Sequence, residues 1–291
     1  MKPYQLLWSL HGQRGHVKVQ APQRPTLLHI HNFDELVFVI NGSGLHVVGK
    51  DRYPLMRGDV FVIKGDQAHK YEKTNNLHIA NLTYRWDHFK FLEKEFADLP
   101  GFKSLFFHEP LYRKSGKFKA KLHLNSWQLN EMTHLLNLIK NEEEEKLPGF
   151  NSVLESLVKI IIVRVCRFYS VAEQPGPKAL LKISAALNYM EKHFPDRITR
   201  SMLAGVADMT DITFYRVFKD ITGCTPIDYL IRLRIEKSAK MMAENNKIKI
   251  IDASINCGFE NSSYFTRKFK AVMGISPRNF LKEQRKLENK S

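Results

Sequence analysis

The chain has 291 residues, with 45 Lys and Arg side chains against 30 Asp and Glu, which gives a formal net charge of +15. This length suits two domains with separate cores, and a composition of 43% hydrophobic and 26% charged residues excludes collagen-like, coiled-coil and disordered chains. A basic excess of this size favours a polyanionic partner such as nucleic acid.

The apolar and cysteine patterns exclude further classes of protein. The most apolar stretch, Leu157 to Cys166, is interrupted by charges and is shorter than the ~20 residues that cross a bilayer, which excludes a transmembrane protein. The N-terminal residues contain no apolar core of signal-peptide length, so we expect a cytoplasmic protein. Three widely spaced cysteines without a C-x-x-C pair support neither a disulfide framework nor a zinc ribbon.

Residues 1–124 are rich in short apolar runs of strand length. Leu36–Ile40 and Val60–Ile63 are examples, and Gly-containing turns such as NGSG and RGD separate such runs. This pattern predicts an antiparallel barrel or sandwich.

Four polar side chains of this region fall on two of the expected strands. His29, His31 and Glu35 occupy odd positions, and therefore one face of a regular strand, while His69 comes from a later strand. Together they could bind zinc, nickel, iron or manganese, hydrogen-bond the hydroxyls of a small polar ligand, or make structural contacts only. Another histidine, His46, carries no comparable pattern.

The spacing H-x-H-x3-E-x6-G resembles the first cupin motif, and Gly58 to His69 resembles the second. Lys64 and Asp66 replace the usual proline and glycine of that second motif, and Lys73 stands where asparagine is common. These departures favour a metal-free effector pocket, with a divalent metal in the barrel as the alternative.

Helical periodicity begins at residue 125 and continues to residue 171. Apolar residues recur at helical spacing on both sides of Pro148-Gly149, which predicts a helical hairpin with its turn there. This hairpin could cover one barrel face, but we expect it to pair two subunits in a homodimer. The following residues 172–178, AEQPGPK, contain two prolines and a glycine and predict an interdomain linker.

Residues 179–291 contain an internal repeat of 51 residues. Phe214, Arg216, Phe218, Lys219, Gly223 and Pro226 recur as Phe265, Arg267, Phe269, Lys270, Gly274 and Pro277. Each copy predicts a short helix, a turn and a second helix with one apolar face, which is the helix-turn-helix arrangement. Thr210 and Asn261 are suitable N-caps for the two second helices.

The second helix of each copy is expected to enter the major groove of DNA. One polar face of each helix presents residues that could reach base edges, and a lysine one turn later suits phosphates. The predicted DNA-binding residues are Ile212, Tyr215, Arg216 and Lys219 in the first copy and Ser263, Thr266, Arg267 and Lys270 in the second. A connecting helix from Ile227 to about Ala243 would span ~25 Å and hold the two copies near successive grooves.

This tandem pattern resembles the AraC/XylS family of bacterial transcription regulators over about Lys182 to Leu281, most specifically in GFENSSYFTRKFKAVMGISP. The first copy departs from it, because Ala207-Asp208-Met209 stands where the second has Gly258-Phe259-Glu260 and its turn lacks the glycine. The resemblance implies double-stranded DNA and RNA polymerase as partners.

Within that family, the sensor half is similar to the L-rhamnose-responsive regulators in H-x-H-N-F-D-E-L-V, G-S-G-L-H-V, H-K-Y-E-K-T-N-N-L and N-L-T-Y-R. We therefore expect an α+β multidomain regulator and no enzyme: a cupin-like barrel in residues 1–124 that senses a sugar such as L-rhamnose, a hairpin, a linker, and an all-α domain with two helix-turn-helix units. The output implied is activation of carbohydrate-use genes. The alternatives are a metal-dependent cupin enzyme fused to a DNA-binding domain and a constitutive DNA-binding protein whose barrel only assembles the dimer.

Overall fold

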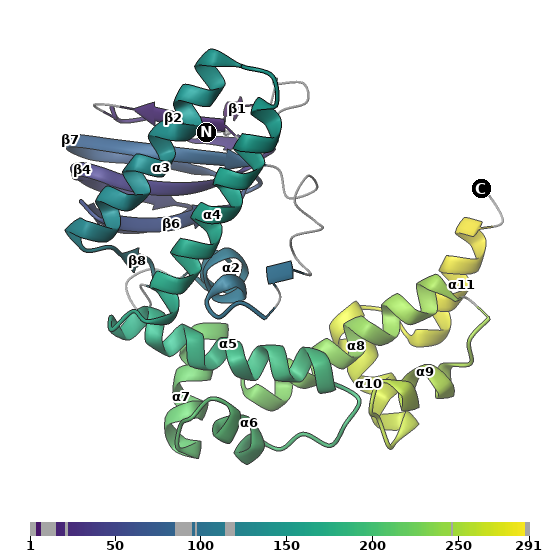
Figure 1. The fold of residues 1–291 in the computed structure, drawn as a ribbon. Coiled ribbons are helices and arrows are strands. Elements are labelled where there is room, and N and C mark those ends of the chain that lie inside the picture. Colours follow the sequence, from purple (N-terminus) through teal and green to yellow (C-terminus); the bar gives the residue numbers. More distant parts are fainter. Residues whose placement is uncertain are drawn as a thin grey trace. The chain divides into compact units, whose positions relative to one another are not determined.

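The structure is a computed structural model that describes residues 4–6, 16–20, 23–84, 95–96, 98–113, 120–245 and 247–288, with side chains between residues 23 and 284. The chain divides into an N-terminal unit, Met1–Leu181, and a C-terminal unit, Lys182–Ser291 (Figure 1). The first combines a sheet with helices and the second is helical, which confirms the expected α+β multidomain class.

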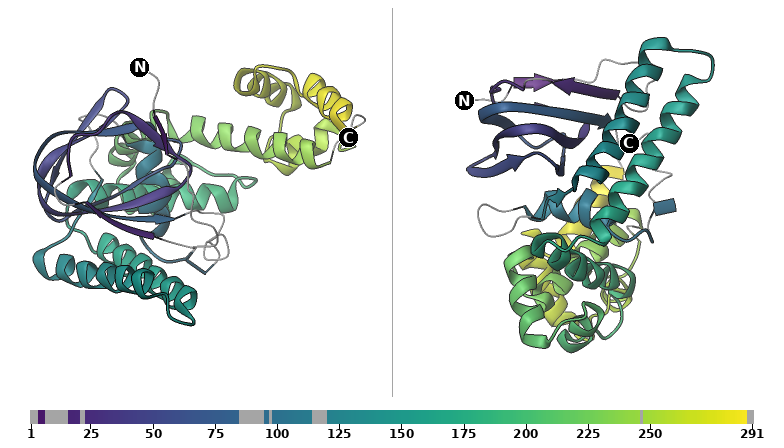
Figure 2. Two further views of the ribbon diagram at one scale, coloured as in Figure 1. Left: turned by 90° about the horizontal axis from the view of Figure 1, so that it is seen from above. Right: turned by 60° about the vertical axis from the view of Figure 1, so that its left-hand side comes forward.

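The N-terminal unit is built on one eight-stranded sheet. Its strands are β1 (Tyr4–Leu6), β2 (His16–Gln20), β3 (His29–His31), β4 (Asp34–Val48), β5 (Asp51–Met56), β6 (Asp59–Ile63), β7 (His69–Tyr84) and β8 (Leu122–His123). The order is β1-β3-β7-β4-β6-β8, with β2 added to β7 and β5 added to β4. The long strands β4 and β7 pair with different neighbours along their lengths, and the sheet curls (Figure 2).

Both faces of the central strands are buried. Val37 and Val39 belong to a core cluster on one face with Phe61, Ile63 and Ile79. The alternate residues Leu36 and Phe38 are fully buried as well. Since successive strand residues point to opposite faces, a second layer must cover the other side of this sheet.

A helical hairpin supplies that layer, as Figures 1 and 2 show. It consists of α3 (Ser126–Glu145) and α4 (Phe150–Ser170), with Gly149 in a left-handed conformation between them, where the sequence predicts the turn. A capping box between Asn125 and Gln128 begins α3. Arg164 of α4 pairs with Glu131 of α3 at 2.8 Å, which ties the two helices together.

Two local predictions for this unit are wrong. His29 to Glu35 is not one regular strand, because the chain bends at Asn32-Phe33 and His31 and Glu35 lie on different strands. Within the region expected to be mostly strands, residues 104–112 form the π-helix η2 (Ser104–His108) and the helix α2 (Glu109–Tyr112). The expected linker, residues 172–178, is helical from Pro175 onward, where α5 (Pro175–His193) begins. Prolines are tolerated in the first turn of a helix, because the N–H groups there have no hydrogen-bond partner within the helix.

The C-terminal unit contains both predicted helix-turn-helix copies. After the C-terminal part of α5, the helices are α6 (Arg200–Val206), α7 (Asp211–Thr222), α8 (Pro226–Glu244), α9 (Ile250–Asn256), α10 (Ser262–Met273) and α11 (Pro277–Glu288). Thr210 and Asn261 cap α7 and α10 through their side chains, as predicted. Among the described residues, no helix combines the length and apolarity needed to cross a bilayer.

Candidate functional site: a DNA-facing surface and a sensor cavity

The predicted DNA-contacting residues lie on the exposed faces of α7 and α10. Each helix buries its phenylalanines, such as Phe214 and Phe265, and so turns the intervening positions outward. Ile212 is 84% exposed although it is apolar, and Arg216 is exposed in the next turn. On α10, Ser263, Thr266, Arg267 and Lys270 are all exposed. The structure therefore gathers each predicted set on one accessible helix face.

Tyr215 and Lys219 complete the set on α7, and Tyr215 is half-buried. The Arg200 guanidinium lies 5.7 Å from the Tyr215 ring centroid and also pairs with Asp211 at 2.5 Å. On α10, Arg267, the counterpart of Arg216 in the repeat, lies 5.4 Å from the ring centroid of its neighbour Tyr264. Aromatic neighbours thus hold a cation near each face.

The second candidate site lies inside the sheet unit, where His31, Glu35 and His69 converge. Their ligand atoms all lie within 4.8 Å of one another. His31 Nε2 is 3.5 Å and His69 Nε2 3.9 Å from the same oxygen, Glu35 Oε2. His29, the fourth predicted residue, lies near His69 with ring centroids 4.2 Å apart and tilted ring planes, but it lies outside this trio of ligand atoms.

The ring orientation of these histidines is set by the backbone. Nδ1 of His31 contacts the carbonyl of Phe33, and Nδ1 of His69 contacts the carbonyl of Gln67 at 3.0 Å. A carbonyl can only accept, so each Nδ1 carries a proton and donates it. Within the described residues, Nε2 of both rings has no hydrogen-bond partner. Asn81 fixes the carboxylate by donating to Glu35 Oε1 at 3.0 Å.

The charge states in this cluster follow from burial and neighbours. Burial lowers the pKa of His69 to about 4, so its imidazole is neutral at pH 7. Burial alone would raise the pKa of Glu35, but the facing imidazole of His31, with His69 and Asn81, lowers it overall. A charged carboxylate therefore faces imidazole nitrogens in the interior.

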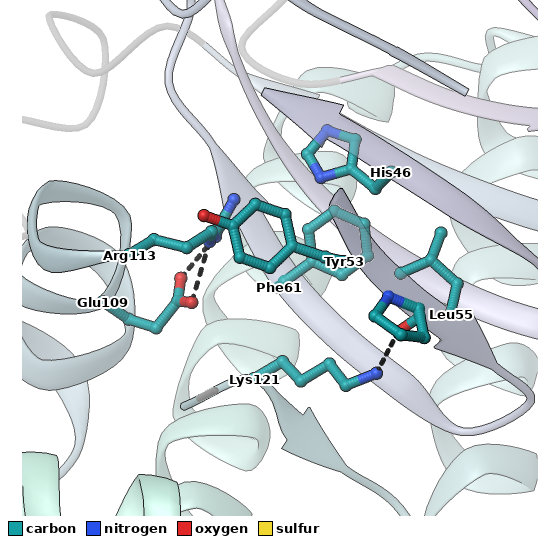
Figure 3. Close-up of a pocket in the computed structure, with 8 residues that line it drawn as sticks. His46, Tyr53, Leu55, Phe61, Glu109, Arg113 and Lys121 are labelled. Carbon is teal, nitrogen blue, oxygen red and sulfur yellow. Dashed lines mark hydrogen bonds and ion pairs between the residues drawn. The ribbon is translucent and has the colours of Figure 1, made fainter. Parts of the chain in front are cut away.

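A cavity, whose lining residues Figure 3 shows, lies near this cluster. Its lining residues come from three strands, from α2 and the residue that follows it, and from the segment before β8: His46, Tyr53, Pro54, Leu55, Phe61, Glu109, Arg113 and Lys121. The His46 ring is 5.4 Å from the His69 ring, so the cavity and the cluster are neighbours. The free volume is about 20 Å³, enough for about one water molecule.

The charged groups of the cavity are already paired. Arg113 forms a two-fold contact with Glu109, and its Nη2 also donates to the Val62 carbonyl at 2.7 Å. Lys121 contacts the buried carboxylate of Asp59 and the Pro54 carbonyl. Burial lowers the pKa of His46 well below its usual value, so that ring is neutral. The cavity wall therefore carries almost no net charge.

Two polar atoms of the wall have no partner among the described residues. They are His46 Nε2 and Arg113 Nη1. The hydroxyl of Tyr71, which does not line the cavity but whose ring lies 5.4 Å from that of His46, also has no partner there. The Arg113 guanidinium lies 5.7 and 5.6 Å from the ring centroids of Tyr53 and Phe61. Buried polar groups are normally hydrogen-bonded, so these atoms indicate a place for a polar ligand against aromatic faces.

Sequence reasoning missed most of this cavity. It assigned no role to His46 and did not single out Glu109, which α2 carries, or Arg113, which follows α2. The one available signal was the G-S-G-L-H-V string, which contains His46 and contributes to the family resemblance.

Comparisons with known proteins also divide the chain into a ligand-binding part and a helix-turn-helix part. A family model described as an AraC-like ligand binding domain matches residues 19–139, and one described as a helix-turn-helix domain matches residues 203–283. The chain is 28% identical over 265 residues, 90% of either protein, to the HTH-type transcriptional activator RhaS of Escherichia coli O1:K1. That name favours a regulator over the metal-dependent enzyme considered above.

Solved structures of the same kind are similar to the chain. ToxT from Vibrio cholerae matches 92% of this chain and 98% of its own, at 14% identity and a TM-score of 0.34. The C-terminal domain of AraT, a response regulator from Geobacillus stearothermophilus, matches 35% of this chain and 84% of its own, at 25% identity and a TM-score of 0.34. On the two family models and the RhaS match, the chain is a DNA-binding transcription regulator that combines an AraC-like ligand binding domain with a helix-turn-helix domain.

Proposed function

We propose that the protein is a sugar-responsive transcriptional activator whose effector, a neutral sugar such as L-rhamnose, binds in the cavity around His46 and Arg113. The observation that carries the proposal is the pairing of every cavity charge while polar atoms of His46, Arg113 and Tyr71 lack partners. A carboxylate or phosphate ligand would need an unpaired cation. Hydroxyl groups need only hydrogen-bond donors and acceptors, and the aromatic rings suit the apolar face of a sugar.

The cavity must open to admit such an effector, because its volume of about 20 Å³ holds about one water molecule. Free and bound forms of the sensor therefore differ in structure. An effector can shift an equilibrium between two forms only by binding one form more tightly than the other. The structural difference between the free and bound forms of the sensor supplies this difference in affinity.

A short route leads from the cavity wall to the chain that enters the C-terminal unit. Lys121 lines the cavity and directly precedes β8, and His123 at the end of β8 contacts Asp59, the same carboxylate that holds Lys121. The His123 carbonyl accepts a hydrogen bond of 3.1 Å from Gln174, the residue before α5. Movement of Lys121 on effector binding would thus reach the start of α5.

The remaining parts of the proposal concern assembly and output. Sequence-specific binding uses the predicted faces of α7 and α10, and the α3–α4 hairpin pairs two subunits through exposed apolar residues such as Val153 and Ile160. In the same proposal, the DNA-bound protein acts on RNA polymerase in the cytoplasm.

The test is the thermal midpoint of the full chain with and without L-rhamnose. A ligand that binds only the folded state adds about 2.7 kcal/mol at 100 times its dissociation constant, so the midpoint rises. His46→Phe keeps an apolar ring in the buried wall but removes the polar Nε2, and we expect it to abolish the rise. His78→Phe, on β7 and remote from the cavity lining, is the matched control and keeps the rise.

A rise with another neutral sugar, but not with L-rhamnose, would keep the sugar sensor and change the effector. No rise with any neutral sugar of a panel, or an equal rise for His46→Phe, would contradict the proposal.

A further inference from the structure

We propose that His31, Glu35 and His69 form a binding site for a divalent transition-metal ion in the N-terminal unit. The three side chains are 3%, 7% and 0% exposed and present two nitrogens and one oxygen to a common point. Two imidazoles and a carboxylate are ligands that zinc, iron, nickel and manganese share. The site goes beyond the proposed sugar sensing and does not depend on the identity of the effector.

The first argument is the orientation of the rings. Because Nδ1 of His31 and of His69 donates to a backbone carbonyl, Nε2 is the ring nitrogen that faces Glu35 and is available as a ligand atom. Metal-bound histidines in proteins usually have this second hydrogen bond, which fixes the tautomer and the ring plane. Asn81 holds the carboxylate in the same way from the other side.

The second argument is the charge that burial leaves uncompensated. Among the described residues, no Lys or Arg lies within ion-pair distance of Glu35, and its neighbours there are the two imidazoles and Asn81. Lys64, which replaces a conventional cupin-motif residue, pairs with Asp34 at 2.6 Å instead. A buried carboxylate surrounded by lone pairs is costly unless a cation joins the group.

A proton on His31 is the competing explanation, since an imidazolium would also pair with Glu35. The two explanations differ in what they predict for binding. A proton needs no added ion, whereas a metal site with three protein ligands binds one ion per chain and keeps open positions for water or a ligand hydroxyl.

The experiment uses the full chain, purified without a polyhistidine tag, stripped with a chelator and dialysed. Co²⁺ is titrated while visible absorption is recorded, and Zn²⁺ is then added in competition. We expect saturation at one Co²⁺ per chain with the visible bands of a nitrogen- and oxygen-ligated ion, and their loss on addition of Zn²⁺. Absence of saturable Co²⁺ or Zn²⁺ binding in the folded wild-type chain would overturn the proposal and leave the protonated His31.

Three variants locate the ion. Glu35→Gln and His69→Gln should each weaken Co²⁺ binding by more than about 100-fold, since loss of even an outer-shell partner costs about 10- to 100-fold. His78→Gln, on the same strand as His69, is the control and should bind as the wild type does. The thermal midpoint of each metal-free variant checks folding, and Glu35→Gln should not lower it because the substitution removes a buried charge. Equal affinity in all three variants would place the ion elsewhere and contradict the site.

Discussion

The two helix-turn-helix copies share their scaffold and differ in the turn. Phe214 and Phe218 lie 5.4 Å apart at 55°, and Phe265 and Phe269 lie 5.5 Å apart at 56°. In each copy the next helix packs one more aromatic ring against the second phenylalanine. The ring centroids of Phe218 and Tyr229 of α8 are 5.7 Å apart, and those of Phe269 and Phe280 of α11 are also 5.7 Å apart. The phenylalanine spacing thus repeats in three dimensions as well as in sequence.

The two turns contain equivalent residues, but these residues are 50 positions apart along the chain, whereas the repeat has a period of 51. Asp208 and Gly258 both have positive φ, of 47° and 80°, and their N–H groups bond to the carbonyls of Gly205 and Ile255. The helices before the two turns, α6 and α9, are 50 residues apart, and the helices after them, α7 and α10, are 51 residues apart. The second turn therefore contains one extra residue, Glu260. The first copy therefore does have a residue in the glycine position, and it is aspartate.

The surroundings of each turn explain the difference. The Asp208 side chain is 93% exposed and Lys182 holds its carboxylate at 2.7 Å; aspartate is among the residues that adopt this conformation most readily. A Cβ on Gly258 would lie 2.4 Å from the Pro195 carbonyl oxygen and 2.9 Å from the Arg234 guanidinium carbon. A repeated turn thus requires a residue that tolerates positive φ, whereas close packing decides whether only glycine fits.

The largest effect is expected from breaking the second turn. Gly258→Ala adds a backbone clash to an unfavourable left-handed conformation and should cost about 3 kcal/mol or more, a fall of the thermal midpoint by roughly 15 °C. Asp208→Ala, the matched change in the open turn, should lower the midpoint by less than half as much. Scanning calorimetry of the two variants measures this, and equal falls would contradict the packing argument.

The same contrast between pattern and packing explains what sequence reasoning could predict. Phe214, Phe265 and the N-caps Thr210 and Asn261 act within one or two helical turns, so periodicity and spacing predicted their helices. The convergence of His31, Glu35 and His69 followed from the histidine spacing, although the expected single strand was wrong because the chain bends between β3 and β4. His31 and Glu35 still meet, at 3.5 Å.

The sensor cavity could not be predicted in this way. Arg113 reaches His46 and Tyr53 only because β4, β5 and α2 meet in space, and no spacing along the chain records that meeting. Its ion pair with Glu109 spans four residues of a short helical segment that has no long apolar period. Tertiary packing, rather than local pattern, brings these side chains together.

A smaller effect is expected at the recognition faces, where the copies differ in chemistry. Ile212 and Tyr215 give the first face apolar and aromatic character, while Ser263 and Thr266 give the second hydroxyls. We expect Arg267→Ala to relax sequence preference by about 1 to 3 kcal/mol at one base pair, and Arg216→Ala to do the same at a different base pair. Binding to operators with single-base changes measures the preference of both variants. Loss of preference at the same base pair in both would contradict the expectation that α7 and α10 each contact their own base pairs.

The smallest effect is expected from Lys219 and Lys270, which are exposed one turn beyond the base-reading positions of α7 and α10. A lysine that neutralises one phosphate releases about 0.9 of a counterion, so each Lys→Ala variant should reduce the salt slope of log affinity by about that amount. Because phosphates carry no sequence information, the loss should be the same on specific and random DNA. Titrations at several salt concentrations with both DNAs give the slopes. A loss confined to specific DNA for one lysine would show that this copy reads bases one turn further along its helix than its partner copy does, and the two faces would then not be equivalent.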